Sequence, residues 1–507
     1  MVYLTLALDK TADSSSTLCS WNNKPEAVRG TFNRFALPII WDFCEPNVLG
    51  MTGATYGGNL VWVYLALKHL LNVGQISENP PTVINGSAIA LETQPFDLIL
   101  TDPPYYDAIP YSDLMDFFYI WQKRTLYGVS EEIDRVFSKA LSPKWNKEEN
   151  DGELIDDASR FGNDLDESKA NYEDGMFRVF QKCYTSLDDN GRLVIVFANK
   201  TPDAWETLVS AIIKSGFVVT GSWPVQTERE ARTRAISSAA LSSSIWIVCR
   251  KRPRVARPGW DHQVIREMER NITAQLREFW DAGIRGPDFV WAATGPALEA
   301  YSQHPVVKKA NEQDQVLTVA EFLSHVRRIV VDFVVGRVLS AGGGAVVGGL
   351  DNVTNYYLLH RYDYGMDDAP INAVILYSMS CNLSDSDLIN TYNILSDGGS
   401  GSDVKLVAWN KRTKGSMGYT VTGGRPIPLI DKAHRLLHLW KAGDVKAVNE
   451  YIDTEGLRRD ALFGQLLQAL IELAPAGSEE RALLESISNH LASTGGIVQP
   501  TMFTDSL

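Results

Sequence analysis

The sequence contains no long hydrophobic run. A helix that crosses a bilayer needs roughly 18 or more consecutive apolar residues, and the 507 residues include no such stretch. The first residues, MVYLTLALDKTADSSS, also lack the basic start and the small-residue cleavage site of a secretory signal peptide. We therefore expect a cytoplasmic protein with no membrane partner.

Cysteine is also scarce. The five cysteines are scattered along the chain and contain no CxxC pair: Cys19, Cys44, Cys183, Cys249 and Cys381. Zinc sites and disulfide frameworks show recognisable cysteine spacings that are missing here. We expect neither kind of site, and we interpret these residues as buried thiols.

Positive charge is in deficit overall but concentrated in places. The formal net charge of −14 argues against a protein coated in positive charge. Much of the excess acid lies in residues 147–174, whose low hydrophobicity predicts a solvated insertion. Bases cluster in residues 228–235, which include Arg232 and Arg234, and in residues 250–258. These clusters either face phosphate groups or belong to a solvated surface on which bases cluster by chance.

Strand and helix patterns alternate up to about residue 255. Short apolar and β-branched runs predict strands, and amphipathic runs between them predict helices. The expected strands are 81–91, 95–101, 192–199, 217–225 and 242–252, and the expected helices are 112–126, 176–187 and 202–216. This alternation predicts an α/β fold with a mostly parallel sheet covered on both faces. From its length, the chain should form two or three domains.

The stretch TDPPYY, residues 101–106, directly follows an apolar strand. Two consecutive prolines cannot donate to a sheet ladder, so the strand must stop at Asp102. In an open α/β sheet, ligands bind beyond the carboxyl ends of the strands. These residues are therefore a candidate site.

Residues 101–105, TDPPY, resemble the catalytic motif of amino-group DNA methyltransferases. Longer strings are similar to the large adenine-specific DNA methyltransferases that carry an amino-terminal domain of unknown function and are often encoded in anti-phage clusters. These strings are TDPPYYDAIPYSDLMDFFYIWQKR, FALPIIWDFCEPN, AWETLVSAIIKSGFVVTGSWPVQTE, ALSSSIWIVCRKR, YYLLHRYDYG and LIDKAHRLLHLWKAGDV. The resemblance covers nearly the whole chain.

The resemblance implies a fold, an activity and a cofactor. Residues 1–255 would form a Rossmann-like methyltransferase sheet, and residues 256–507 a mostly helical region. The chain would transfer a methyl group from S-adenosyl-L-methionine to the 6-amino group of adenine in DNA, in phage defence or restriction-modification. The same chemistry would serve the 4-amino group of cytosine. A non-catalytic DNA-binding or assembly subunit is the alternative from another class.

The motif suits the chemistry of an exocyclic amine. The lone pair of such an amine is delocalised into the base, so the nitrogen is a poor nucleophile. Hydrogen bonds from the amine to Asp102 and to a carbonyl around Pro103, held by Pro104, would free the lone pair, and the carboxylate would stabilise the charge that develops. Tyr105 would stack on the flipped base, and Tyr106 would line the same pocket. Tyr111 is a further expected substrate-binding residue.

Polar residues upstream are candidates for binding the methyl donor. Asp42, Glu45 and Asn47 lie in an apolar and aromatic segment, a setting that favours ligand binding, although capping acids at a helix start would give the same pattern. Thr101 borders the motif, and Ser87 lies where the family tends to carry an acid that contacts the donor's adenine.

The family's glycine-rich donor loop, Asp-Pro-Phe-x-Gly-x-Gly, is not found. Residues 50–58 and 340–352 are rich in glycine, but we interpret both as flexible loops. We therefore expect a sheet that is incomplete at its amino-terminal side. Three explanations are open: a split enzyme completed by a protein subunit that carries the missing segment, an inactive remnant, or a start codon placed too late.

The region after residue 255 has helical spacing and no catalytic signature. His434 and His438 are spaced as metal ligands on a helix would be, but no third ligand is evident. We interpret them as packing residues and expect no metal. Gripping the DNA duplex or docking a partner is the expected role of this region.

Overall fold

The computed structural model divides the chain into two compact units. Unit 1 comprises residues 1–94 and 104–186, and unit 2 comprises residues 95–103 and 187–507. The described residues are 1–23, 26–32, 40–74, 81–90, 95–106, 109–142, 144–199, 201–226, 243–311, 315–340, 349–396, 403–412 and 426–493. The boundary expected near residue 255 does not separate these units, because the sheet and the helices that follow it belong to unit 2.

Unit 2 is built on a four-stranded sheet. Its strands are β3 (Phe96–Thr101), β4 (Leu187–Phe197), β5 (Phe217–Gln226) and β6 (Ser243–Lys251), in the order β3-β4-β6-β5. β3 is parallel to β4, whereas β6 runs antiparallel to both of its neighbours. The α/β class and these four strands are confirmed. The sheet is mixed and not mostly parallel as expected, because β6 returns between β4 and β5 and runs antiparallel to both.

Helices cover one face of this sheet. The adjacent rings of Phe197 and Trp205 meet edge to face, and Trp205 of α6 (Pro202–Lys214) stacks on Trp291 of α9 (Gly286–Ser302) with ring centroids 4.7 Å apart. The opposite face is open at β3, where Leu98 and Leu100 are 58% and 57% exposed. At β3 the sheet is therefore not covered on both faces as expected.

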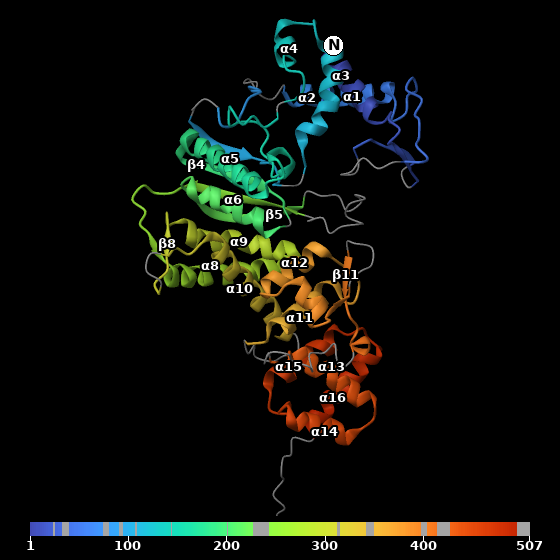
Figure 1. Cartoon of the computed structure of the whole chain (residues 1–507), viewed down its shortest axis with the longest axis vertical. Coiled ribbons are helices and arrows are strands. Elements are labelled where there is room, and N and C mark those ends of the chain that lie inside the picture. Colours follow the sequence, from blue (N-terminus) through green and yellow to red (C-terminus); the bar gives the residue numbers. More distant parts are fainter. Residues whose placement is uncertain are drawn as a thin grey trace, which may run out of the picture. The chain divides into compact units, whose positions relative to one another are not determined.

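The rest of unit 2 is mostly helical, as expected for the region after residue 255, and forms the yellow to red part of Figure 1. Its helices are α8 (Asp261–Asp281), α9, α10 (Val319–Ser340), α11 (Asn352–Tyr364), α12 (Ile371–Ser380), α13 (Leu429–Lys441), α14 (Val445–Thr454), α15 (Ala461–Leu473) and α16 (Glu479–Ser493). Its short elements are β7 (Gly259–Trp260), β8 (Val307–Lys308), β9 (Ala369–Pro370), η2 (Asp387–Thr391), β10 (Leu395–Ser396), β11 (Asp403–Leu406) and η3 (Trp409–Lys411).

The described part of unit 1 contains helices and one short hairpin, joined by long loops. Its elements are α1 (Val2–Asp13), β1 (Ser20–Asn22), β2 (Ala27–Arg29), α2 (Tyr56–Gly74), α3 (Tyr111–Leu126), α4 (Glu131–Val136), η1 (Ala158–Phe161) and α5 (Leu165–Ser186). The strand expected at 81–91 is wrong, because residues 81–90 contain no strand. Val83 and Ile84 in this segment are 91% and 70% exposed, so the apolar run has no buried face to pair.

Residues 50–58 are more than the flexible loop that we expected. Their last three residues begin α2. A Cβ atom at Gly58 would lie 1.9 Å from the carbonyl oxygen of Thr52, so the turn before the helix requires glycine there. The segment thus forms the tight turn that begins α2.

The acidic segment 147–174 is not a solvated insertion. Ile155, Phe161 and Tyr172 are each at most 5% exposed, and α5 begins within the segment. A Cβ atom at Gly175 would lie 2.1 Å from a methyl carbon of Leu154, so the segment packs closely on α5. None of the helices among the described residues combines the length and the apolar character that a membrane span requires.

Candidate functional site

Asp102 directly follows the last residue of β3, at the carboxyl end of the strand, in unit 2. Its side chain is exposed. It makes no hydrogen bond or ion pair with any residue in the described part of the chain. The neighbouring Thr101 hydroxyl is buried and has no hydrogen-bond partner there. The carboxylate is therefore available to a ligand.

The turn that follows Asp102 is held by Tyr172. The division between the two units falls between Pro103 and Pro104, so this turn is described within unit 1. The Tyr172 hydroxyl donates a 2.6 Å hydrogen bond to the Pro104 carbonyl and accepts a 3.3 Å bond from the Tyr106 N–H. The Tyr106 N–H also lies 2.9 Å from the Pro104 carbonyl, and the Tyr106 carbonyl accepts from the Asp156 N–H at 3.1 Å. These bonds fix the backbone on the carboxyl side of Pro104.

Tyr106 adopts a backbone conformation that is unusual for a side chain of its size. Its φ angle is +58°, in the left-handed region. Bulky residues adopt this region at a cost of about 1–3 kcal/mol, and the cost is tolerated where the surroundings impose it, often at functional sites. The bonds to Tyr172 and Asp156 impose it here.

The three tyrosines predicted to bind the base have different surroundings. The Tyr106 ring is 8% exposed and packs edge to face on Tyr172 with centroids 5.2 Å apart. Tyr106 is therefore buried in unit 1, which leaves little of it open to a base. Tyr105 is partly exposed, and Tyr111, the first residue of α3, is 51% exposed. Tyr111 is thus the most exposed of the three and Tyr106 the least.

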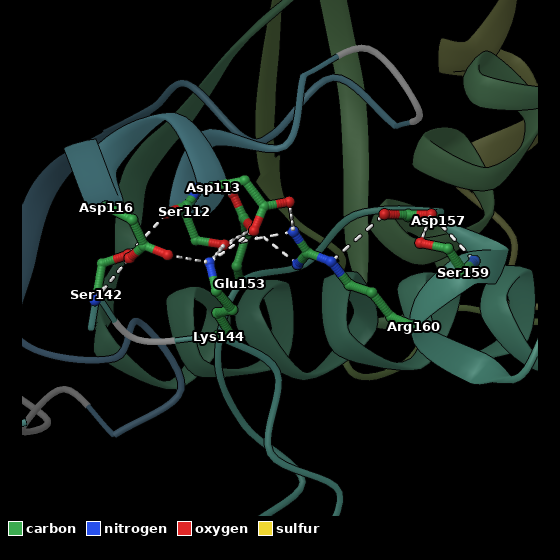
Figure 2. A network of polar contacts seen from close by, with 9 residues as sticks. All are labelled: Ser112, Asp113, Asp116, Ser142, Lys144, Glu153, Asp157, Ser159 and Arg160. Atoms are coloured by element: carbon green, nitrogen blue, oxygen red, sulfur yellow. Dashed lines mark hydrogen bonds and ion pairs between the residues drawn. The ribbon is translucent and has the colours of Figure 1, made fainter. Parts of the chain in front are cut away.

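The first turn of α3 is anchored by a charged network (Figure 2). The Glu153 carboxylate accepts from the Ser112 N–H at 2.8 Å, from the Ser112 hydroxyl at 2.5 Å and from Arg160 at 2.8 Å. Asp113 accepts from Lys144 at 2.6 Å and from Arg160 at 3.2 Å. Acids near a helix amino terminus also interact favourably with its dipole. The network joins α3 to Lys144 and to Glu153 and Arg160 of the acidic segment.

These contacts hold the first turn of α3 in place, and we call the network the α3 clamp. The hydrogen bond from Lys144 lowers the pKa of Asp113, because it stabilises the ionised carboxylate. Arg160 contacts three acids and is 14% exposed. We did not predict these residues from the sequence. The apolar residues within 147–174, such as Ile155 and Phe161, were the signal that this segment folds.

The residues predicted to bind the donor are not brought into contact. Asp42 and Glu45 are exposed, and the Asn47 side chain accepts a 3.2 Å bond from the Leu49 N–H in the turn before α2. The Ser87 hydroxyl donates to Asp151 at 2.8 Å. These residues belong to unit 1, whereas Thr101 belongs to unit 2. No hydrogen bond between described atoms joins any two of the five.

The remaining predictions concern two arginines, a metal site and two histidines. Arg232 and Arg234 lie outside the described residues. Among the described residues, no group of three or more His, Cys, Asp or Glu side chains could hold a metal ion. His434 contacts Arg412 at 2.7 Å, and His438 lies 2.9 Å from the Trp409 carbonyl, so both histidines are packing residues as predicted.

Comparison of the chain with protein-family models, with curated proteins and with solved structures finds no match. The methyltransferase resemblance of residues 101–105 therefore remains an expectation from the sequence.

Proposed function

We propose that this chain binds and activates the target base of an S-adenosyl-L-methionine-dependent, adenine-specific DNA methyltransferase. The observation that carries the proposal is the exposed, unpaired Asp102 carboxylate at the carboxyl end of β3. A fixed turn follows it directly in the chain. The resemblance adds a setting in phage defence or restriction-modification.

Asp102 accepts a hydrogen bond from the 6-amino group of the flipped adenine. A backbone carbonyl accepts the second amine hydrogen. The Pro104 carbonyl already accepts from Tyr172 and Tyr106, whereas the Pro103 carbonyl has no donor among the described residues, which favours Pro103 for this role. The negative carboxylate stabilises the positive charge that develops on the nitrogen during transfer.

Tyr105 stacks on the flipped base. Removing a base from the duplex costs a few kcal/mol, and stacking on an aromatic ring returns about 1–3 kcal/mol. Tyr105 adjoins the fixed Pro104 carbonyl in the chain, and its partly exposed ring suits this role.

Among the described residues, no hydrogen bond joins the side chains predicted to bind the methyl donor. Asp42, Glu45 and Asn47 are exposed, and the Ser87 hydroxyl donates to Asp151. The donor supplies an electrophilic sulfonium methyl group when it is bound. We assign no step of the reaction to this chain's donor contacts.

Asp102→Ala tests the proposal. Methylation of DNA is measured by mass spectrometry of the nucleosides, for the chain alone and together with the product of the neighbouring gene. The variant should lower the rate at least about a hundredfold, as loss of a group that stabilises transition-state charge does. Asp97→Ala, which removes another exposed acid of β3, is the control and should keep the parent rate.

Two outcomes would overturn the proposal: full activity of Asp102→Ala, or no methylation by either the chain or the complex. The nucleoside formed also separates two substrates, because N4-methylcytosine in place of N6-methyladenine would identify cytosine.

A non-catalytic assembly subunit is the second candidate. The open face of β3, with Leu98 and Leu100 more than half exposed, favours it, because such a surface suits a partner. Binding of DNA or a partner without any methylation, unchanged in Asp102→Ala, would establish this alternative.

A further inference from the structure

A cavity of about 490 Å³ lies in the helical part of unit 2. It is bounded by α10, by the start of α11 and by the residues that end α12. Ligand sites are typically of about 300–1,000 Å³ and combine apolar walls with a few polar groups. The cavity has this character and is unrelated to the motif at Asp102.

Three charged or titratable side chains of α10 reach the cavity. His325, Arg328 and Asp332 are spaced one and two turns apart, so they share one side of the helix. None of them makes a hydrogen bond or an ion pair with another residue that the structure describes. Burial raises the pKa of Asp332, and the positive charge of Arg328 opposes this.

Amide side chains and apolar residues complete the lining. Asn352 and Asn355 lie one turn apart at the start of α11, and Asn355 is 9% exposed. Val331 and Val335 of α10 are each 4% exposed and form an apolar wall. The lining of the cavity thus combines hydrogen-bond donors and acceptors with apolar surface.

We propose that this cavity binds a nucleoside monophosphate. Arg328 and His325 together suit a phosphate group, which is doubly charged and accepts several hydrogen bonds. Asp332 can accept from the ribose hydroxyls, and the amides of Asn352 and Asn355 match the donors and acceptors on the edge of a base. The base itself packs on the apolar wall.

Calorimetric titration of the full chain tests this assignment with four probes: adenosine monophosphate, cytidine monophosphate, adenosine and inorganic phosphate. At least one of the two monophosphates should bind more tightly than adenosine or phosphate. Arg328→Ala should weaken that binding at least about tenfold, because a hydrogen bond to a charged group is lost. Asp332→Asn should weaken binding of the monophosphate and of adenosine but not of phosphate.

Arg337→Ala is the matched control. Arg337 is an exposed arginine of the same helix, and it does not line the cavity. Its substitution should leave the affinity unchanged. Asp102→Ala should also bind the nucleotide normally, because this proposal does not depend on the methyltransferase activity.

The proposal fails if neither monophosphate binds at millimolar concentration. It also fails if Arg328→Ala and Arg337→Ala bind equally well, or if inorganic phosphate binds as tightly as the monophosphates.

Discussion

The hydroxyl group of Tyr172 holds the turn after Asp102 by two hydrogen bonds. Tyr172 is 1% exposed, so Tyr172→Phe removes both of these bonds from a partly buried place and leaves the Tyr106 N–H as the remaining donor to the Pro104 carbonyl. Loss of a typical hydrogen bond costs about 0.5–1.5 kcal/mol. We expect a lower thermal midpoint for unit 1 and faster hydrogen exchange at the Tyr106 amide, measured by calorimetry and mass spectrometry.

Tyr119→Phe is the control for this substitution. The Tyr119 hydroxyl also donates to a backbone carbonyl, that of Lys139 at 2.8 Å, but the bond is exposed to solvent. Water can replace it, so the loss should be smaller. Equal effects of the two substitutions would show that Tyr172 has no special role at the turn.

Buried histidine makes unit 2 sensitive to acid. Burial lowers the pKa of His360 to about 4, and the charge of Arg361 adds to this. A histidine whose folded pKa is depressed stays neutral in the fold while the unfolded chain takes up a proton. Its contribution to stability is therefore complete above pH 6.5 and declines by about 1.4 kcal/mol per pH unit as the pH falls toward 4. His434 acts in the same direction, because burial lowers its pKa well below the usual range.

His360→Gln removes the imidazole that takes up a proton when the chain unfolds in acid. The thermal midpoint of unit 2 should fall less steeply between pH 6.5 and pH 4 in the variant than in the parent, as followed by calorimetry. An identical pH dependence in the two proteins would contradict the assignment of a neutral His360.

Single residues differ in how far the sequence could predict them. The exposed acid at Asp102 follows from an acid and two prolines after a strand, which are local features. The inward packing of Tyr106 depends on Tyr172, which is distant in the sequence, so no local pattern indicated it. The same holds for Glu153, whose partners lie on α3 and η1.

At the scale of elements, the α3 clamp provides a prediction. Arg160→Met should destabilise unit 1 by about 2–4 kcal/mol, because it leaves Glu153, which is 12% exposed, without its cation. Lys147→Met is the control, since Lys147 and Glu167 form a pair in which both side chains are more than half exposed. Such pairs contribute about 0–1 kcal/mol. Chemical denaturation monitored for unit 1 measures both, and equal losses would show that Arg160 is no more than a surface charge.

Elements with a buried face were predicted better than segments with mixed composition. The strands near 192–199, 217–225 and 242–252 have β-branched residues that pack on helices, and they form as expected. Residues 81–90 have a similar apolar run but no partner surface. In 147–174 the many charged residues obscured the folding signal, which lay in apolar residues such as Ile155 and Phe161 and in the pair of Arg160 with Glu153.

At the scale of the whole molecule, the open face of β3 predicts self-association. Phe96, Leu98 and Leu100 alternate along β3 on one face and are 43%, 58% and 57% exposed. Exposed apolar strands at a sheet edge tend to pair with other chains. Leu100→Glu should reduce association of the isolated chain in sedimentation experiments while leaving its thermal midpoint nearly unchanged.

Leu165→Glu is the control, because Leu165 is a single exposed leucine on α5 and 73% exposed. It should leave association unchanged. A parent chain that sediments as a monomer at high concentration would show that β3 is not a contact surface.

The path of the chain through its two units determines what happens when the backbone is cleaved between them. β3 enters unit 2 from between two pieces of unit 1, and β3 pairs in parallel with β4. A single cleavage between Ser186 and Leu187 would therefore leave β3 on the amino-terminal fragment and β4 on the other. The two fragments would stay joined by the backbone hydrogen bonds of one strand pair. The cleaved protein should therefore run as one species under native conditions. The two fragments should separate only when the sheet unfolds, because β3 pairs with β4 although no covalent bond connects the fragments.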